Sequence, residues 1–288
     1  MTSEAKGLAL AVTGALVLTP DALFMRLSGM DGLQMLAWRA PCMGLVFLTV
    51  WLLATREPGD LRRLASGAGV TVLGAQVVNA TLFPMGIALA PVAVMLLAVA
   101  TVPVWSALLA RAVYGETTSY RTWAAIAAVF VGIAVAVSGE EGGIGSGALW
   151  GVVCGLGVAV SLATSFVTLR HNPELPLLLA VGIGAVLAGL IGIAATGPSN
   201  MADGQVWAIL ITGLVILPIS FLSLNAATRW TAAANVSLLM LLETVLGPLW
   251  VWWGIGEAPG PRALIGGAIV VGSLLLYLLS RRRRGRAV

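Results

Sequence analysis

The chain is divided by glycine, proline and charged residues into a succession of apolar runs. Each run is about 20 residues long, the length that an α-helix needs to cross roughly 30 Å of hydrocarbon. The loops between them are short, and the longest, residues 55–66, cannot form a soluble domain. The sequence therefore predicts an all-α integral membrane protein with ten transmembrane helices. We place them at residues 7–27, 33–54, 67–88, 91–113, 120–138, 147–169, 176–196, 205–227, 232–255 and 262–280.

The composition excludes most other classes of protein. Only 10% of the residues are charged and 59% are hydrophobic, whereas about 25% of an ordinary soluble domain is charged. The two cysteines, Cys42 and Cys154, lie in separate apolar runs and indicate neither a disulfide framework nor a metal site. No phosphate-binding loop, cluster of metal ligands or Ser-His-Asp arrangement can be assembled. We expect no catalytic residues, no metal, no cofactor and no nucleic-acid partner, and a lipid bilayer around the chain.

The arginines predict the orientation, because short loops rich in Lys and Arg stay in the cytoplasm. With an even number of spans both termini share one side of the membrane. That side collects thirteen of the sixteen basic residues, and the other side holds Arg26, Arg39 and Arg262. We therefore predict that both termini are cytoplasmic. The thirteen are Lys6, Arg56, Arg62, Arg63, Arg111, Arg121, Arg170, Arg229, Arg281, Arg282, Arg283, Arg284 and Arg286.

The chain also contains an internal repeat. Gly115-Glu116 and Gly256-Glu257 are 141 residues apart, close to half the length of the chain, and each pair follows a long apolar run and precedes a Gly-rich one. We divide the chain into residues 1–141 and 142–288, each with five spans. An odd number of spans makes the second copy enter the membrane from the opposite side. Inverted repeats are typical of transporters, whose substrate site lies between the halves near the midplane.

These features give the chain a resemblance to a known family. It resembles the drug/metabolite transporter superfamily with two EamA-type halves, and within it the YddG-type exporters of aromatic and other neutral amino acids. The resemblance implies a bacterial inner-membrane protein. The first half departs from the pattern of the second, because Val102 stands where Glu243 would be expected. The residues that carry the resemblance are Trp38-Arg39, Leu241 to Glu243, Pro248 and Gly256-Glu257, with Pro103 and Gly115-Glu116 in the first half.

Three ionisable residues stand inside the expected spans, where a charge costs at least about 3 kcal/mol unless it is paired or functional. Asp21 and Arg39 are predicted to lie at equal depth, roughly 9 Å from the same membrane surface. They form a structural ion pair, act as a gate, or contact a substrate carboxylate. Glu243 is predicted near the midplane. It is a neutral structural acid, a contact for a substrate amine, or a proton carrier.

Further candidates for a substrate site are polar or adaptable residues at mid-depth. Gln76 and Asn79 are three residues apart on one helical face. They either hold neighbouring helices together by hydrogen bonds or orient a zwitterionic substrate. Met95, Trp105 and Met240 are candidate walls of the cavity.

We therefore expect a transporter that exports small neutral or aromatic amino acids by alternating access. The resemblance supplies the substrate class, and a largely apolar route suits neutral substrates with hydrophobic side chains. The rivals are a proton-coupled exporter of cationic drugs that uses Glu243, a carrier of nucleotide sugars or organic anions, an intramembrane enzyme, and a scaffold that transports nothing. The sparse intramembrane arginines count against the anion carrier. We expect a monomer, with dimerisation and proton coupling left open.

Overall fold

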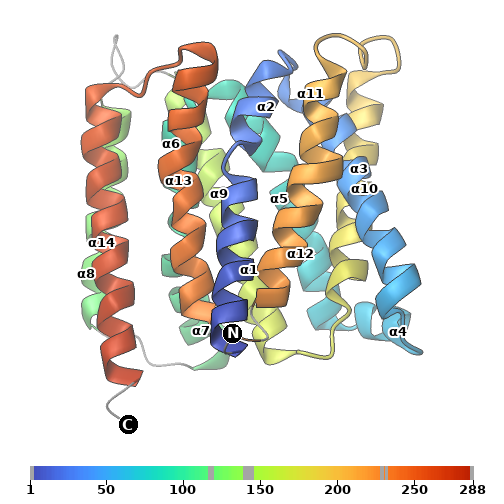
Figure 1. Ribbon diagram of the computed structural model, residues 1–288, viewed down its shortest axis with the longest axis horizontal. Coiled ribbons are helices and arrows are strands. Elements are labelled where there is room, and N and C mark those ends of the chain that lie inside the picture. Colours follow the sequence, from blue (N-terminus) through green and yellow to red (C-terminus); the bar gives the residue numbers. More distant parts are fainter. Residues whose placement is uncertain (1–2, 116–119, 139–145, 228–229, 231–232, 286–288) are drawn as a thin grey trace.

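The structure is a computed structural model that describes residues 3–115, 120–138, 146–227, 230 and 233–285. Those residues form helices, turns and connections and contain no β-strand. The helices run side by side, and α1 begins at the same end of the bundle at which α14 ends (Figure 1). We call this the proximal end and the opposite end the distal end. The elements are α1 Ser3–Leu18, α2 Asp21–Leu27, α3 Gly32–Val50, η1 Trp51–Thr55, α4 Asp60–Leu64, α5 Gly67–Leu89, α6 Val92–Val99, α7 Val102–Tyr114, α8 Tyr120–Val137, α9 Ser146–His171, α10 Leu177–Thr196, α11 Val206–Ile211, η2 Thr212–Ile216, α12 Leu217–Ala227, α13 Ala233–Ile255 and α14 Pro261–Gly285.

Seven helical segments among the described residues are long and apolar enough to cross a membrane. Two shorter apolar segments, Ala127–Ala136 and Pro261–Ser273, lie in α8 and α14. The all-helical membrane fold is thus present, and the count of ten spans stays a prediction. The seven segments are Ala9–Leu27, Gly32–Thr55, Gly67–Leu89, Val92–Tyr114, Gly147–His171, Leu177–Thr196 and Val206–Leu224.

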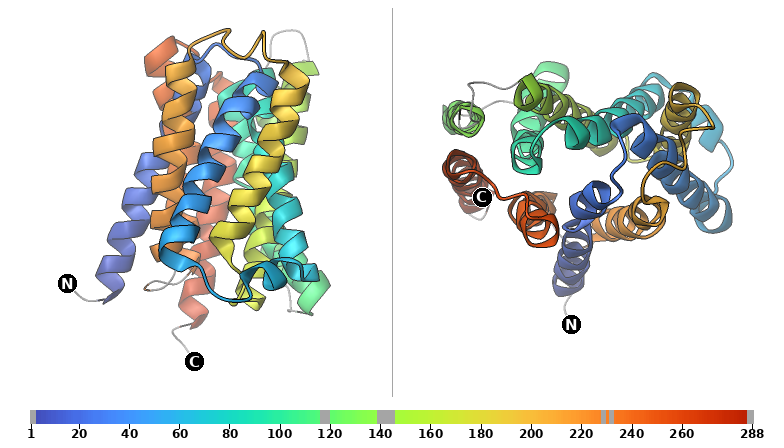
Figure 2. Two further views of the ribbon diagram at one scale, coloured as in Figure 1. Left: turned by 90° about the vertical axis from the view of Figure 1, so that its right-hand side faces the viewer. Right: turned by 90° about the horizontal axis from the view of Figure 1, so that it is seen from above.

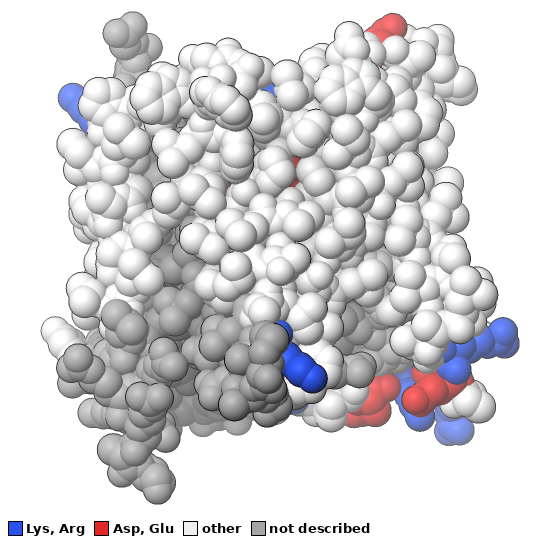
Figure 3. All heavy atoms as spheres, in the orientation of Figure 1, with Lys and Arg blue, Asp and Glu red and all other residues white. Residues whose placement is uncertain are grey.

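The exposed charged side chains lie mostly near the ends of the molecule. On the face shown in Figure 3, Lys, Arg, Asp and Glu gather at the proximal end, and the broad band above them is almost entirely uncharged. Arg56, Arg62 and Lys6 are exposed near that end. Such a band matches the hydrocarbon layer of a bilayer, in which exposed charges are costly.

The most extensive helix contacts all join the first half of the chain to the second. They pair α3 with α10, α5 with α9, α8 with α14, and α1 with α12. Under the repeat expected from the sequence, α3 corresponds to α10 and α8 to α14. The same repeat relates α1 to α9 and α5 to α12, so that it converts the contact between α5 and α9 into the contact between α12 and α1. The halves therefore pack against each other, and in Figure 2 helices of the first half, blue to green, lie beside helices of the second, yellow-green to red. The expected boundary at residues 141 and 142 lies outside the described residues.

Glycines allow the closest of these crossings. A Cβ added at Gly44 in α3 would lie 2.8 Å from the carbonyl oxygen of Gly182 in α10, and one at Gly182 would lie 3.3 Å from that of Gly44. Gly132 in α8 and Gly266 in α14 make a second mutual approach, in which a Cβ added at either glycine would lie within 3 Å of the carbonyl oxygen of the other. In a membrane, small residues of this kind let helix backbones meet and gain van der Waals contact.

Prolines interrupt some of the spans. The first span breaks between α1 and α2 at Pro20, and the fourth breaks between α6 and α7 just before Pro103. A π-helical turn precedes Pro218 in the eighth span, whereas Pro84 and Pro248 lie inside the uninterrupted helices α5 and α13. A helix break at membrane depth is tolerated where it is buried in protein or lines a cavity. The first two breaks do border the cavity described next.

Candidate functional site

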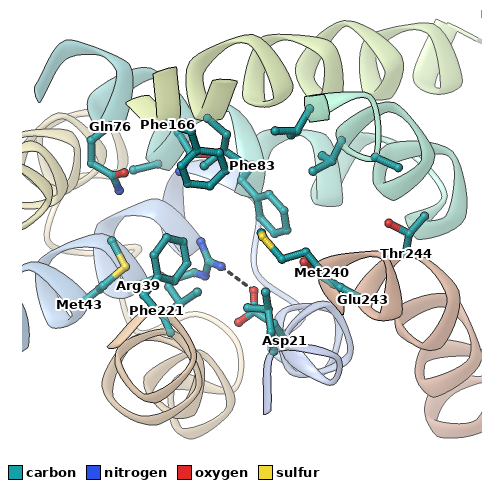
Figure 4. Close-up of a pocket in the computed structure, with 18 of the residues that line it drawn as sticks. Asp21, Arg39, Met43, Gln76, Phe83, Phe166, Phe221, Met240, Glu243 and Thr244 are labelled. Carbon is teal, nitrogen blue, oxygen red and sulfur yellow. Dashed lines mark hydrogen bonds and ion pairs between the residues drawn. The ribbon is translucent and has the colours of Figure 1, made fainter. Parts of the chain in front are cut away.

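A cavity opens near the middle of the bundle, between the two halves (Figure 4). Its lining comes from α1, α2, α3, α5 and the α6–α7 break of the first half, and from α9, α12 and α13 of the second. Most of the lining is apolar. The charged and polar side chains on it are Asp21, Arg39, Gln76, Asn79, Glu243 and Thr244. The break between α6 and α7 contributes Ala100, Val102 and Pro103 to the apolar part.

Asp21 and Arg39 form an ion pair in the wall of this cavity. Nη2 of Arg39 donates to Oδ2 of Asp21 at 2.5 Å. Asp21 stands in the first turn of the short helix α2, where the break at Pro20 turns it inward, and it is fully buried. The ring of Phe83 lies under the guanidinium, 5.0 Å from ring centroid to Cζ, close enough for a cation–π interaction. The sequence expectation of equal depth is consistent with this pairing.

Glu243 faces the pair from the second half of the chain. It lies on α13 beside Met240 and Thr244, and all three line the cavity. Figure 4 shows Met240 and Glu243 converging on the space next to Asp21. The charges of Asp21 and Arg39 both act on Glu243. The cavity thus holds two carboxyl groups and one guanidinium, contributed by both halves.

Gln76 and Asn79 line the same cavity from α5. Gln76 is buried and packs its Cβ and Cγ close to Gly184 of α10, at 2.9 and 3.0 Å from a Cβ position there. Its amide points toward the open space in Figure 4. The two amides that the sequence placed on one helical face are thus both on the cavity wall, and their role in orienting a substrate stays a prediction.

Two of the expected wall residues lie elsewhere. Met95 is fully buried in a cluster of apolar residues behind the cavity, packed against Gly86, Cys154 and Gly155. Trp105 donates to Oγ1 of Thr101 and packs edge-on against Phe130 of α8. Neither residue is part of the cavity lining. The reason is the break between α6 and α7, which brings Val99, Ala100, Val102 and Pro103 to the cavity in place of the residues on either side of them.

Aromatic residues that sequence reasoning did not single out supply much of the wall. Phe83 of α5, Phe166 of α9 and Phe221 of α12 line the cavity, together with Met43 of α3. In Figure 4, Phe83 and Phe221 lie on either side of Arg39. An apolar side chain in a membrane span suits lipid, core and cavity equally, so the sequence gives no signal for them.

Hydrogen bonds between the halves cluster toward the distal end. Arg26 of α2 pairs with Glu257 at 3.1 Å and donates to the carbonyl oxygen of Ala90. Glu257 in turn accepts from the backbone N–H of Val92. Further hydrogen bonds also join the two halves. Four of them are accepted by backbone carbonyl oxygens, from Gln34 to Asn200, Trp38 to Met201, Gln205 to Ser28 and Arg262 to Ser138. In another, the indole N–H of Trp250 donates to the hydroxyl of Thr19.

The described residues contain no group of three or more His, Cys, Asp and Glu side chains that could hold a metal ion. The cavity offers instead a charged pair, a carboxyl group, two amides and aromatic walls. Such a set suits the reversible binding of a small molecule that is partly polar and partly apolar.

A family model described as "EamA-like transporter family" matches residues 5–138 and, a second time, residues 149–279. No curated protein matches the chain. A solved crystal structure has a similar fold, with a TM-score of 0.67 at 20% identity, over 97% of this chain and 98% of that one. At that identity the likeness concerns the fold alone.

Proposed function

Because the chain belongs to the EamA-like transporter family, and is therefore a multi-pass membrane transporter, we propose that it exports small neutral or aromatic amino acids by alternating access. The cavity between the halves carries this proposal. Its aromatic and thioether walls suit a hydrophobic side chain, while its few charged groups suit a compact polar head. The proposed setting is the bacterial inner membrane, with the protein acting as a monomer.

Alternating access requires that contacts between the halves break at one end and form at the other. The contacts around Arg26 and Glu257 tie the distal end, so the structure corresponds to a state closed there. We assign the proximal end to the cytoplasm, since Lys6, Arg56 and Arg62 are exposed near it. Under this assignment, release of an exported substrate requires the distal contacts to open.

The first test is transport by purified protein in proteoliposomes. We expect labelled phenylalanine to exchange across the membrane without a pH gradient, with leucine and tryptophan competing and ethidium not transported. Protein-free liposomes measure the background. Flux of ethidium alone, and only with a pH gradient, would refute amino-acid export.

That result would favour the second candidate, a proton-coupled exporter of cationic drugs. The observation that favours it is the position of Glu243, a carboxyl group on the cavity wall at membrane depth. An acid in this position can alternately hold a proton and a cation.

Glu243→Gln separates the two candidates, because the amide keeps the shape of the side chain and cannot ionise. For a facilitative amino-acid exporter we expect downhill phenylalanine exchange to persist in this variant within about tenfold of wild type, since the amide oxygen still accepts a hydrogen bond from a substrate ammonium group. For a proton-coupled exporter, gradient-driven accumulation disappears and downhill exchange remains. The measurement is transport with and without an imposed pH gradient. Glu57→Gln, the same exchange at an exposed carboxyl group outside the cavity, is the control and is expected to leave both kinds of transport unchanged.

A further inference from the structure

Arg39 is incompletely satisfied at the cavity wall. A guanidinium carries five N–H donors, and toward the described residues Arg39 makes one hydrogen bond, to Oδ2 of Asp21. Its Nε is buried and has no acceptor there. The residue as a whole is only 8% exposed. A buried donor without an acceptor is costly, so the Nε edge indicates an acceptor group that occupies the cavity during function.

Asp21 has the complementary deficit. Its Oδ2 accepts from Arg39, and its Oδ1 is buried without a donor from the described residues. The side chain is 0% exposed. A carboxylate normally accepts several hydrogen bonds, and this one lies in a membrane span, where polar groups need partners inside the protein. Oδ1 therefore indicates a donor group next to the acceptor required by Arg39.

The surroundings restrict where such a ligand can extend. Phe83 covers one face of the guanidinium, and Phe221 and Met240 form apolar wall near the pair. Glu243 reaches the same space from the second half, and both charges of the pair act on it. A ligand whose head lies at Arg39 and Asp21 therefore has an apolar space for its tail and contacts both halves of the protein.

We propose that Arg39 and Asp21 hold the head group of a zwitterionic amino acid, with its carboxylate on the Nε edge of Arg39 and its ammonium group at Oδ1 of Asp21. Glu243 adds a second carboxyl group beside the ammonium. This inference rests on the proposed amino-acid export and assigns the recognition to the charged pair, not to Gln76 and Asn79. Because the bound head group contacts Asp21 and Arg39 of the first half and Glu243 of the second, its binding also links the two halves.

A ligand with a single charged group cannot supply both the acceptor that Nε of Arg39 lacks and the donor that Oδ1 of Asp21 lacks. An amine without a carboxylate reaches Asp21 and Glu243 but leaves Nε of Arg39 without an acceptor. An acid without an amine satisfies Nε, whose planar edge matches a carboxylate, but leaves Oδ1 of Asp21 unpaired and adds a negative charge beside two carboxyl groups. A zwitterion satisfies both atoms and adds no net charge.

The first experiment uses wild-type protein and three ligands that share a phenyl group. In phenylalanine counterflow, we compare unlabelled phenylalanine, phenethylamine and 3-phenylpropionate as competitors. Each missing head group removes hydrogen bonds to a charged partner, so we expect each analogue to compete about 10- to 100-fold more weakly than phenylalanine. Equal competition by phenethylamine would overturn the proposal, because Arg39 would then contribute nothing to recognition.

The second experiment separates recognition from a purely structural ion pair. Arg39→Gln and Asp21→Asn each leave a buried partner alone and are expected to abolish phenylalanine counterflow. The double variant Asp21→Asn/Arg39→Gln removes both charges together and is expected to be as monodisperse and as thermally stable as wild type. Under the proposal it still transports phenylalanine at least tenfold more slowly. A double variant with wild-type transport would show that the pair is structural and overturn the proposal.

Controls distinguish the failure of this inference from the failure of the proposed function. Arg62→Gln changes an exposed arginine of α4, outside the cavity, and is expected to transport phenylalanine at the wild-type rate. If wild-type protein does not exchange phenylalanine at all, amino-acid export is refuted. If wild type exchanges it and the double variant does so equally well, export stands and the assigned head-group site does not.

Discussion

Gly44→Leu is expected to yield little or no monodisperse protein. Gly44 and Gly182 sit at the crossing of α3 and α10, the pair of helices with the most extensive contact in the bundle. A Cβ on Gly44 would come within 2.8 Å of the Gly182 carbonyl oxygen and 3.0 Å of the Val186 amide nitrogen. Backbone atoms cannot rotate away as a side chain does, so the two helices must separate along their length.

The cost follows from overpacking. Extra carbon atoms in a packed interior typically cost about 1–3 kcal/mol and sometimes more, and a leucine adds four at this crossing. We expect a fall in the unfolding temperature of roughly 10 °C, or loss of the folded protein, with 1 kcal/mol corresponding to about 2–4 °C for a chain near this size. Size-exclusion chromatography and thermal unfolding in detergent measure both outcomes.

Gly74→Leu is the matched control. Gly74 lies in α5, is exposed on the outside of the bundle, and has nothing within 4 Å of its added Cβ. We expect this variant to remain within about 0.5 kcal/mol of wild type, as for surface substitutions in general. If Gly44→Leu proved as stable as Gly74→Leu, the backbones of α3 and α10 would not approach each other as closely at Gly44 as the structure has them.

Glu257→Gln is expected to open the distal end. The Glu257 carboxylate accepts from Arg26 and from the N–H of Val92, and these bonds join the two halves. Hydrogen bonds to charged groups contribute about 1.5–3 kcal/mol each, and the partial exposure of both side chains, 23% and 29%, places this pair at the lower end. A loss of about 1.4 kcal/mol multiplies the population of the open state about tenfold.

Accessibility of a cysteine in the cavity measures this change. In a background of Cys42→Ser and Cys154→Ala, Thr244→Cys places a thiol on the cavity wall. Intact cells are treated with a membrane-impermeant maleimide, which reaches the protein from outside the cytoplasm. With Glu257→Gln we expect labelling to be about tenfold faster than with native Glu257, in line with the population shift.

Glu57→Gln provides the control, because it weakens an ion pair with Arg63 that is 66% exposed on the Glu57 side and lies within one half, at the proximal end. We expect Thr244→Cys to be labelled at the same rate with Glu57→Gln as in the parent protein that keeps Glu57 and Glu257. Equal rates for Glu257→Gln and Glu57→Gln would mean that the contacts at Glu257 do not hold the halves together.

The candidate site was partly visible in the sequence. Asp21, Arg39, Glu243, Gln76 and Asn79 stand out because polar groups are costly in hydrocarbon, and in the structure all five line the same cavity. The ion pair of Asp21 and Arg39 spans only 18 residues, so equal depth was enough to suggest it. Their functions are not fixed by this placement, and the experiments above test them.

Apolar residues carried no comparable signal. Met95 and Met240 are the same residue type in similar runs, yet Met95 is enclosed in the core and Met240 lines the cavity. Phe83, Phe166 and Phe221 were not expected at the site. Lipid tails are as apolar as a leucine side chain, so hydropathy does not separate a residue that faces lipid from one that faces a neighbouring helix or a cavity.

The sequence by itself determined that the chain is helical, lies in a membrane and consists of two related halves. These properties follow from run length and composition, because each backbone polar group in hydrocarbon must be satisfied within its own helix. Only the tertiary structure decided which helices cross and which residues meet, such as Arg26 and Glu257 across 231 residues. Those contacts depend on shape at close approach, as at Gly44 and Gly182, and neighbours along the chain do not encode it.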